Sequence, residues 1–103
     1  MNTIKIIYIT TPSQEEAEKI ALHLLEKKLI ACAQFHPINS VYWWQGSLTK
    51  DNEFMLLAKT TEELYGLVKQ EAEKIHSYAV PCIIGISSHV NDSYYNFIKE
   101  TVS

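Results

Sequence analysis

The chain alternates between stretches in which every second residue is apolar and stretches in which apolar residues recur every three or four positions. Residues 4–9 are apolar in both alternating sets apart from Lys5, which predicts that residues 3–10 form a central strand buried on both faces. The aromatic and β-branched run from Ala31 to Gly46 predicts a long strand ending in a turn at 45–47. Residues 53–59 predict a strand that returns beside it, so the two form a long β-hairpin.

Helical spacing follows three polar start signals. Ser13-x-x-Glu16 matches a capping box and predicts a helix that ends near Lys27-Lys28. Thr60 or Thr61 starts a second helix, residues 82–88 form a short strand, and Asn91 or Asp92 starts a last helix. The positions expected to face inward are Ala17, Ile20, Ala21, Leu24 and Leu25, then Leu64, Leu67, Val68, Ala72 and Ile75, then Tyr94, Phe97, Ile98 and Val102.

This order of elements predicts the fold class. A strand, helix, strand, strand, helix and strand in succession are typical of an α+β, ferredoxin-like (split βαβ) antiparallel sandwich, here with an extra C-terminal helix and a single domain over 1–103. Both long helices should cover one face of the sheet. Apolar residues also occupy the alternating positions that should face the other side of the sheet. We assign Ile7, Ile9, Met55 and Leu57 to that face. A second apolar face and exposed hairpin aromatics predict self-association.

Composition excludes several classes of protein. The net charge is −3 and the chain has no arginine, which argues against nucleic acid, including an RNA-binding sheet, and against an anionic membrane surface. No apolar stretch approaches the roughly 20 residues of a membrane span. The two cysteines are too few for a disulfide scaffold, and the N-terminus has no signal-peptide pattern. We therefore expect a soluble, cytoplasmic protein.

Histidine and cysteine provide the candidate metal ligands. His76 stands at a helix end in the loop before Pro81, where it could be a capping residue or a ligand. Cys82 follows Pro81, and Cys32 lies among small residues; each is either a buried packing residue or a soft ligand. Imidazole and thiolate together suit copper or zinc.

Other candidates surround a possible ligand cleft. Lys59 ends an apolar strand, where its ammonium group either reaches solvent or faces an anion near a helix start. Trp43 and Trp44 are adjacent, so one should face the core and the other an interface or pocket. Gly46 is the expected turn residue with a positive backbone angle. No catalytic triad, phosphate loop or paired-acid signature is present, so no enzyme activity is predicted.

Four segments carry a resemblance to a known family. They are Lys28-Leu29-Ile30-Ala31-Cys32-Ala33, Ser40-x-Tyr42-x-Trp44-x-Gly46, Lys59-Thr60 and His76-x-Tyr78-x-x-Pro81. Together they resemble the corresponding segments of the CutA divalent-cation tolerance family, nearly end to end. The resemblance implies a PII-like homotrimer built through long hairpins. It also implies a role in tolerance of copper and other divalent metals, with copper binding in some members and no obligatory cofactor.

This chain departs from the family pattern in the loop. The family usually has proline, and often an acid, where Ser77 and Ala79 stand, and often glutamate in place of Cys82. Fewer carboxylates and an added thiol would favour Cu(I) over hard cations.

Two functions remain open at this point. The first is a trimeric metal-response protein with an inter-subunit cleft formed by Tyr42, Trp44, Lys59 and Tyr78, and with His76, Cys82 and Cys32 as candidate ligands. The alternative is a PII-like structural or signalling trimer that acts through an unknown protein partner, with incidental metal binding. A hydrolase would need a carboxylate–histidine pair that the sequence does not reveal.

Overall fold

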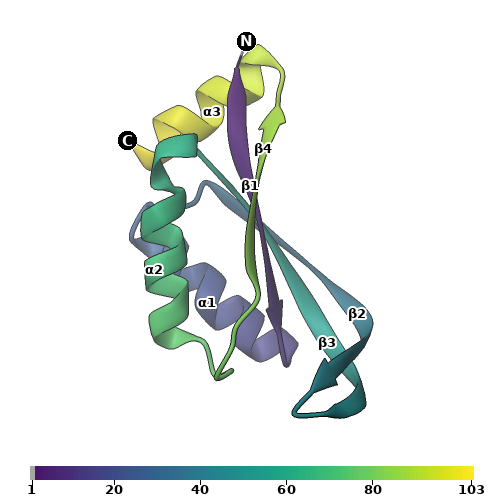
Figure 1. The fold of residues 1–103 in the computed structure, drawn as a ribbon. Coiled ribbons are helices and arrows are strands. Elements are labelled where there is room, and N and C mark those ends of the chain that lie inside the picture. Colours follow the sequence, from purple (N-terminus) through teal and green to yellow (C-terminus); the bar gives the residue numbers. More distant parts are fainter. Residues whose placement is uncertain (1) are drawn as a thin grey trace.

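The structure, a computed structural model, describes residues 2–103 as one sheet with helices packed against it (Figure 1). None of the helices in this range is long and apolar enough to cross a membrane. The elements in chain order are β1 (Thr3–Thr11), α1 (Gln14–Glu26), β2 (Cys32–Trp44), β3 (Ser47–Thr60), the 3₁₀ turn η1 (Glu62–Leu64), α2 (Tyr65–Ile75), β4 (Ile83–His89) and α3 (Asp92–Val102).

The sheet is antiparallel throughout, with the strand order β2-β3-β1-β4. β1 is central, as the sequence predicts. β2 is an edge strand, which is where Pro37 is tolerated because it has no N–H to donate. The hairpin is longer than predicted, because β3 begins at Ser47 rather than at Glu53. Residues 47–52 are polar apart from Leu48 and show no apolar alternation, yet pairing with β2 extends the strand through them.

Helices α1 and α2 cover one face of the sheet. Ile7 and Ile9 of β1 join Leu56 and Ala58 of β3 in the main core, together with Ile20, Leu24, Val68 and Ala72 from the helices. Strand register corrects one assignment. Ile7 pairs with Ala58 and Tyr8 with Leu57, so Ile7 and Ile9 lie on the helix-covered face, while Met55 and Leu57 share the opposite face with Tyr8.

The ends of α1 are set by local hydrogen bonds. Ser13 is the N-cap, and its Oγ accepts from the Glu16 N–H at 3.2 Å. In a complete capping box the Glu16 carboxylate would accept from the Ser13 N–H. Here it makes a tertiary contact instead, accepting from the N–H and hydroxyl of Ser77 at 3.0 and 2.9 Å. At the other end Lys28 has φ +57°, and the N–H groups of Lys28 and Leu29 donate to Leu25 and Leu24. This is a Schellman motif.

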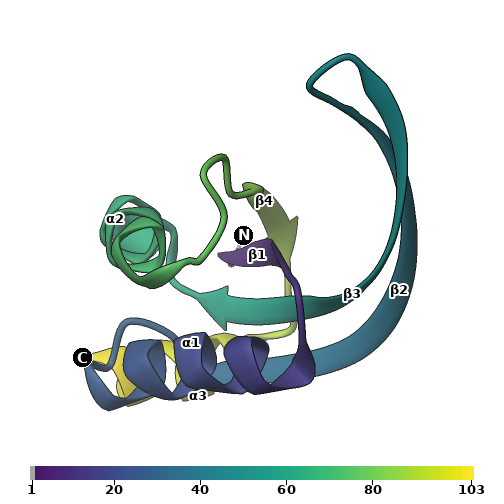
Figure 2. The same ribbon diagram turned by 90° about the horizontal axis from the view of Figure 1, so that it is seen from below.

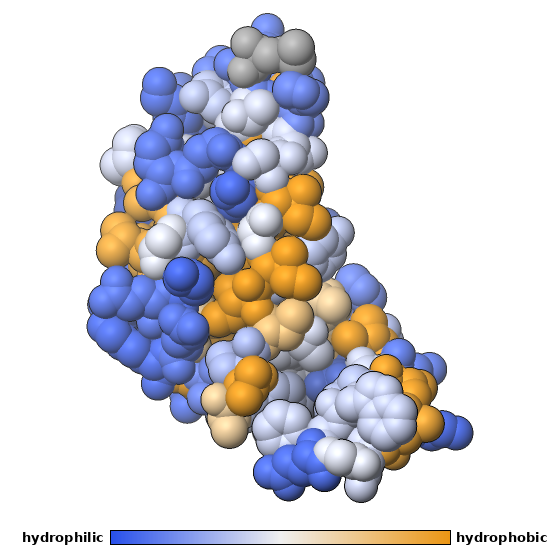
Figure 3. Space-filling view, in the orientation of Figure 1, coloured by the Kyte–Doolittle hydropathy of each residue, from blue (hydrophilic) through white to orange (hydrophobic). Residues whose placement is uncertain are grey.

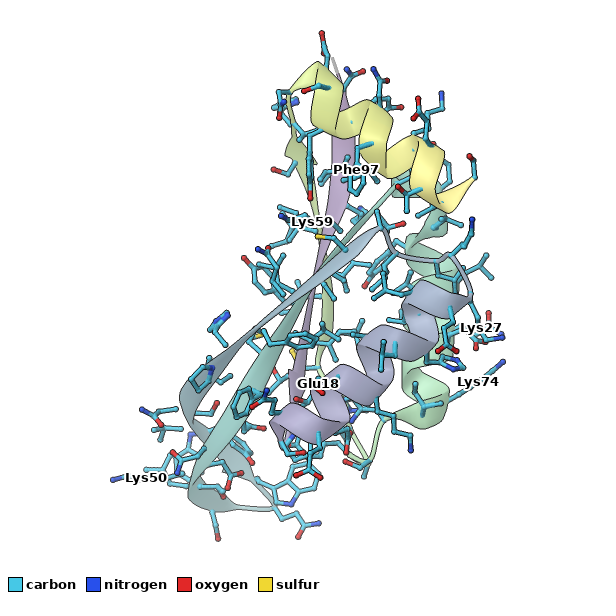
Figure 4. The ribbon with its side chains drawn as sticks, turned by 180° about the vertical axis from the view of Figure 1, so that it is seen from behind. Glu18, Lys27, Lys50, Lys59, Lys74 and Phe97 are labelled. Atoms are coloured by element: carbon cyan, nitrogen blue, oxygen red, sulfur yellow. The ribbon has the colours of Figure 1, made fainter. Side chains whose placement is uncertain are left out.

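Two residues expected on inner helix faces lie largely outside. Leu67 is 50% exposed because η1 precedes α2 and the buried stripe starts at Tyr65, continuing through Val68 and Ala72. Phe97 is 46% exposed because α3 covers only the end of the sheet (Figure 4). There α3 forms a second cluster in which Ile4, Ala31 and Ile98 are buried.

A charged cluster joins α1 to α2. The Glu71 carboxylate lies 2.9 Å from His23 Nε2, 3.0 Å from Lys74 Nζ and 3.8 Å from Lys27 Nζ. Figure 4 shows Lys27 and Lys74 on neighbouring helices at this junction. His23 is therefore held between the helices. The hydrogen bonds from His23 and then Lys74 lower the pKa of Glu71 to about 2.

The β2–β3 hairpin curves away from the body of the molecule (Figure 2). It contributes to an elongated shape of 45 × 25 × 21 Å. Gln45 and Gly46 form its two-residue turn with φ of +50° and +80°, as a type I′ turn requires. The predicted positive backbone angle of Gly46 is thus confirmed.

We predict opposite effects of adding a methyl group at two glycines. Gly46→Ala should destabilise the fold by about 1–2 kcal/mol, because a side chain disfavours positive φ although space is free there. Gly66→Ala in α2, where space is also free and φ is not positive, should stabilise it by about 0.5–1 kcal/mol. Urea unfolding measures both. Changes of the same sign in the free energy of unfolding of the two variants would contradict the turn geometry.

We also predict that Glu71 makes stability depend on acidity. Its folded pKa is below its ordinary value of 4.5, so its contribution is present above that value and is lost as the pH falls from about 4.5 to about 2. Glu71→Gln should therefore unfold at lower urea than wild type at neutral pH, and the difference should shrink on acidification. Glu73→Gln, an exposed acid on the same helix, is the matched control and should show no such trend.

Candidate functional site

A groove of about 830 Å³ lies between the outer part of the hairpin and the loop that joins α2 to β4. Tyr42, Trp43 and Trp44 form the hairpin wall, and Ala79, Val80 and Cys82 form the loop wall; Thr10, Asn39, Ser40, Val41, Glu53 and Tyr78 complete the lining. Neither tryptophan joins the core: Trp43 is 73% exposed and Trp44 41% exposed. The sequence predicted that one of Trp43 and Trp44 would face the core, but both side chains line the groove from the hairpin side.

Two tyrosine–carboxylate pairs lie at this groove. The Tyr78 hydroxyl donates to Glu53 Oε2 at 2.5 Å, and the Tyr42 hydroxyl donates to Asp51 Oδ2. Asp51 and Glu53 are two residues apart on β3, so their side chains share a face of the strand. The first pair ties the α2–β4 loop to the hairpin, and the second lies within the hairpin.

The carboxylates make both phenols harder to ionise. The hydrogen bond to Asp51 is the main cause that raises the pKa of Tyr42 to about 12. Burial, followed by the hydrogen bond to Glu53, raises the pKa of Tyr78 above its ordinary range. Each phenol also feels the carboxylate of the other pair, so the four groups form one electrostatic unit. At neutral pH the hydroxyls are donors and the carboxylates are acceptors.

The His76 side chain is buried and has partners on both ring nitrogens. Nε2 lies 2.7 Å from the Thr10 carbonyl, so it donates, and Nδ1 accepts from the Tyr78 N–H at 3.1 Å. Glu16 Oε2 is 3.5 Å from Nδ1. The imidazole thus connects β1, α1 and the α2–β4 loop. To bind a metal it would have to release one of these hydrogen bonds.

The two cysteines lie in different places. Cys82 is exposed in the groove, contrary to the packing role that the sequence also allowed. Cys32 pairs with Lys59 at the other end of the sheet, and its Sγ lies 3.5 Å from the Tyr94 hydroxyl. This hydrogen bond is the main cause that raises the pKa of Tyr94 to about 12. The register from Ile6 to Thr10 separates the two ends by about 13 Å along β1.

Lys59 lies with Cys32 rather than with the groove. Its Nζ is 5.3 Å from the centre of the Tyr94 ring, a cation–π contact beneath α3 (Figure 4). A single chain therefore brings together Tyr42, Trp44, Tyr78 and Cys82, with His76 and Pro81 in the adjoining loop, but leaves Cys32 and Lys59 elsewhere. Within residues 2–103, no three His, Cys, Asp or Glu side chains are grouped as a metal site.

Sequence reasoning missed Glu53 and Asp51. It placed the turn at residues 45–47 and the returning strand at 53–59, so Asp51 lay outside the predicted strand and the two acids appeared unrelated. Their spacing of two residues was the available signal, because it places both on one face of any strand that contains them. The burial of Glu53, which is 5% exposed, depends on the loop carrying Tyr78 and could not be read from spacing.

Comparison with known proteins gives concordant results. The family model described as CutA1 divalent ion tolerance protein matches residues 5–101. The divalent-cation tolerance protein CutA of Archaeoglobus fulgidus is 45% identical over 97 residues, which cover 93% of this chain and 95% of that protein. The corresponding protein of Thermotoga maritima is 39% identical over 98 residues, which cover 94% and 97%.

Solved structures agree with the sequences. The periplasmic divalent cation tolerance protein CutA from Archaeoglobus fulgidus has a TM-score of 0.95 at 44% identity, covering 97% of this chain and 99% of that chain. The divalent ion tolerance protein CutA1 from Ehrlichia chaffeensis has a TM-score of 0.94 at 35% identity, covering 100% and 98%. With near-complete coverage in both sequence and structure, this chain belongs to the CutA1 family of divalent ion tolerance proteins.

Proposed function

We propose that this protein serves divalent-cation tolerance as a homotrimer, with a metal or small-ligand cleft between subunits and no catalytic reaction. The observation that carries the proposal is the sheet face opposite α1 and α2. Ile84 and Ile86 of β4 are 49% and 45% exposed on that face. Figure 3 shows apolar side chains gathered down the middle of the molecule, where Figure 1 places β4. Monomers rarely leave such a patch uncovered.

The hairpin supports the same proposal. Within residues 2–103, no third strand pairs with the outer ladder from residue 53 toward the tip, because β1 pairs with β3 only from Lys5–Thr60 to Thr11–Phe54. Two-stranded ribbons are marginal by themselves, and exposed edges attract further chains. The ferredoxin-like arrangement proposed here, with two helices on one sheet face, leaves the other face free for PII-like assembly. A cyclic trimer would cover the face and support each hairpin.

Cys82 is the residue best placed for a soft metal. Its thiol is exposed in the groove, and thiolates select Cu(I) over hard cations. His76 could add a nitrogen only by releasing Thr10 or Tyr78. In the proposed trimer further ligands come from a neighbouring subunit, whose Lys59 and Cys32 would also have to approach the cleft to act there.

The alternative remains a PII-like structural or signalling trimer with an unknown protein partner. The exposed pair Trp43 and Leu48 at the hairpin tip favours it, because aromatic and aliphatic anchors are typical of protein contacts. For location we propose the cytoplasm, supported by two cysteines that are not paired with each other. Relatives differ in this respect: one from Archaeoglobus fulgidus is described as periplasmic and one from rice as chloroplastic.

We predict a mass of about 35 kDa, three times the chain mass of 11.8 kDa, in light scattering on a size-exclusion column. Ile86→Lys should reduce it to the chain mass, because a charge would have to be buried in the interface. Leu22→Lys changes a somewhat more exposed apolar residue of α1 and should leave the trimer intact. A wild-type monomer at micromolar concentration would exclude the proposed assembly.

We predict that Cu(I) binds more tightly than Mg²⁺ and that Cys82→Ser weakens Cu(I) binding at least tenfold. Cys32→Ser, at the other end of the sheet, tests whether the second cysteine takes part. Competition titrations with a chromophoric Cu(I) chelator measure the affinities. The Cu(I) affinity of His76→Ala should be compared with wild type under conditions in which both are equally folded, because the His76 imidazole also holds the α2–β4 loop in place. Unchanged Cu(I) affinity in Cys82→Ser would exclude the thiol as a ligand.

A further inference from the structure

Glu53 is a buried carboxylate whose charge has no cationic partner. It is 5% exposed, and it lines the groove. Its Oε2 accepts from Tyr78, whereas its Oε1 accepts no hydrogen bond from the residues that the structure describes. None of the ion pairs within residues 2–103 includes it. The free Oε1 is not fully buried, so it can be reached from the groove, where a cation would offset the cost of a charge on a largely buried side chain.

A second acid increases the local negative charge. Asp51 lies on the same strand face, and its carboxylate is bonded only to the Tyr42 hydroxyl. It also forms no ion pair in the described part of the chain. Lys50, the residue before Asp51, belongs to the opposite strand face and projects from the far end of the hairpin (Figure 4). The groove therefore holds one acid, Glu53, with a second acid, Asp51, beside it on the same strand, and neither forms an ion pair within residues 2–103.

The walls of the groove are suited to an organic group. Tyr42, Trp43 and Trp44 supply aromatic surface, and Ala79 and Val80 supply aliphatic surface. A volume of about 830 Å³ lies within the range of small-molecule sites. Aromatic rings attract cations through their negative faces, and their apolar surface favours an attached carbon chain.

We propose that this groove binds an organic cation, a primary ammonium or guanidinium on a short aliphatic chain, with its headgroup at the free Oε1 of Glu53. The inference rests on the cleft of the proposed function and names a ligand class for it. The headgroup donates to Glu53, Asp51 contributes long-range attraction, and the chain packs on the aromatic wall. Tyr78 holds the carboxylate in place through its hydrogen bond to Oε2.

A hard metal ion fits the same groove less well. Mg²⁺ and Ca²⁺ need six or more oxygen ligands in total, and Mg²⁺ retains most of its water. At this position one carboxylate oxygen is free, and both tyrosine hydroxyls are already donors. An ammonium or guanidinium needs only hydrogen-bond acceptors and gains from the apolar wall.

The test compares two ligands of the same length. n-Pentylammonium and n-pentanol differ in charge but share the alkyl chain, and tryptophan fluorescence of the full-length protein reports their binding. We expect saturable binding of n-pentylammonium in the range of about 0.1–10 mM, weakened by salt, and at least tenfold weaker binding of n-pentanol. Equal binding of the two, or no saturable response to the ammonium, would overturn the proposal.

Glu53→Gln removes the charge but keeps the shape and an acceptor for Tyr78. It should weaken n-pentylammonium binding at least tenfold without changing the response to n-pentanol. Glu63→Gln, on an exposed acid of η1, is the matched control and should bind as wild type. Unchanged ammonium affinity in a folded Glu53→Gln would also overturn the proposal. The wild-type comparison of the two ligands remains decisive should this variant fail to fold.

The same samples separate this inference from the proposed function. Mass and Cu(I) affinity are measured beside ammonium binding in wild type and Glu53→Gln. Ammonium binding by a monomer, or without any Cu(I) site, would support the inference while the trimer or copper proposal fails. A trimer that binds Cu(I) through Cys82 but binds n-pentylammonium no more tightly than n-pentanol would retain the proposed function and overturn the inference.

Discussion

The long antiparallel ladder between β2 and β3 is the feature on which the rest of this molecule depends. It runs from Cys32–Lys59 at the body to Trp44–Ser47 at the tip, whereas β1 supports β3 only as far as Phe54. The inner half thus belongs to a four-stranded sheet and the outer half to a ribbon. A ribbon of this kind needs support from outside the ladder. The groove, the exposed aromatics and the proposed assembly all follow from this overhang.

The support within one chain comes from a single loop. The Thr10 N–H donates to the Cys82 carbonyl and the Thr10 carbonyl accepts from His76, so the end of β1 holds both ends of the α2–β4 loop. Ser77 adds a contact to α1 through Glu16, and Tyr78 reaches the hairpin at Glu53. His76 is therefore central to the shape of the groove even though both of its nitrogens are occupied. The imidazole is buried with both nitrogens hydrogen-bonded, and satisfied buried polar groups of this kind give rigidity.

The chemistry of the groove follows from what the loop places over it. This chain carries Ala79 and Cys82 on the loop wall, and its carboxylates come instead from β3. The thiol of Cys82 on one wall and Glu53 on the other, with Asp51 beside it, would provide separate positions for the soft metal and the organic cation proposed above. Family membership connects the protein with divalent-cation tolerance.

The sequence alone determined the order of elements, the central position of β1 and the turn at Gly46, because apolar periodicity, capping residues and glycine chemistry act over short distances. The family was equally readable from local motifs such as Ser40-x-Tyr42-x-Trp44. Only the tertiary structure decided which side chains meet. The burial of Glu53 beneath Tyr78, the engagement of His76 by Thr10 and the separation of Cys32 from Cys82 depend on strand register and on a loop docking across the sheet. Such contacts join residues far apart in the chain, and no local pattern encodes the geometry that brings them together.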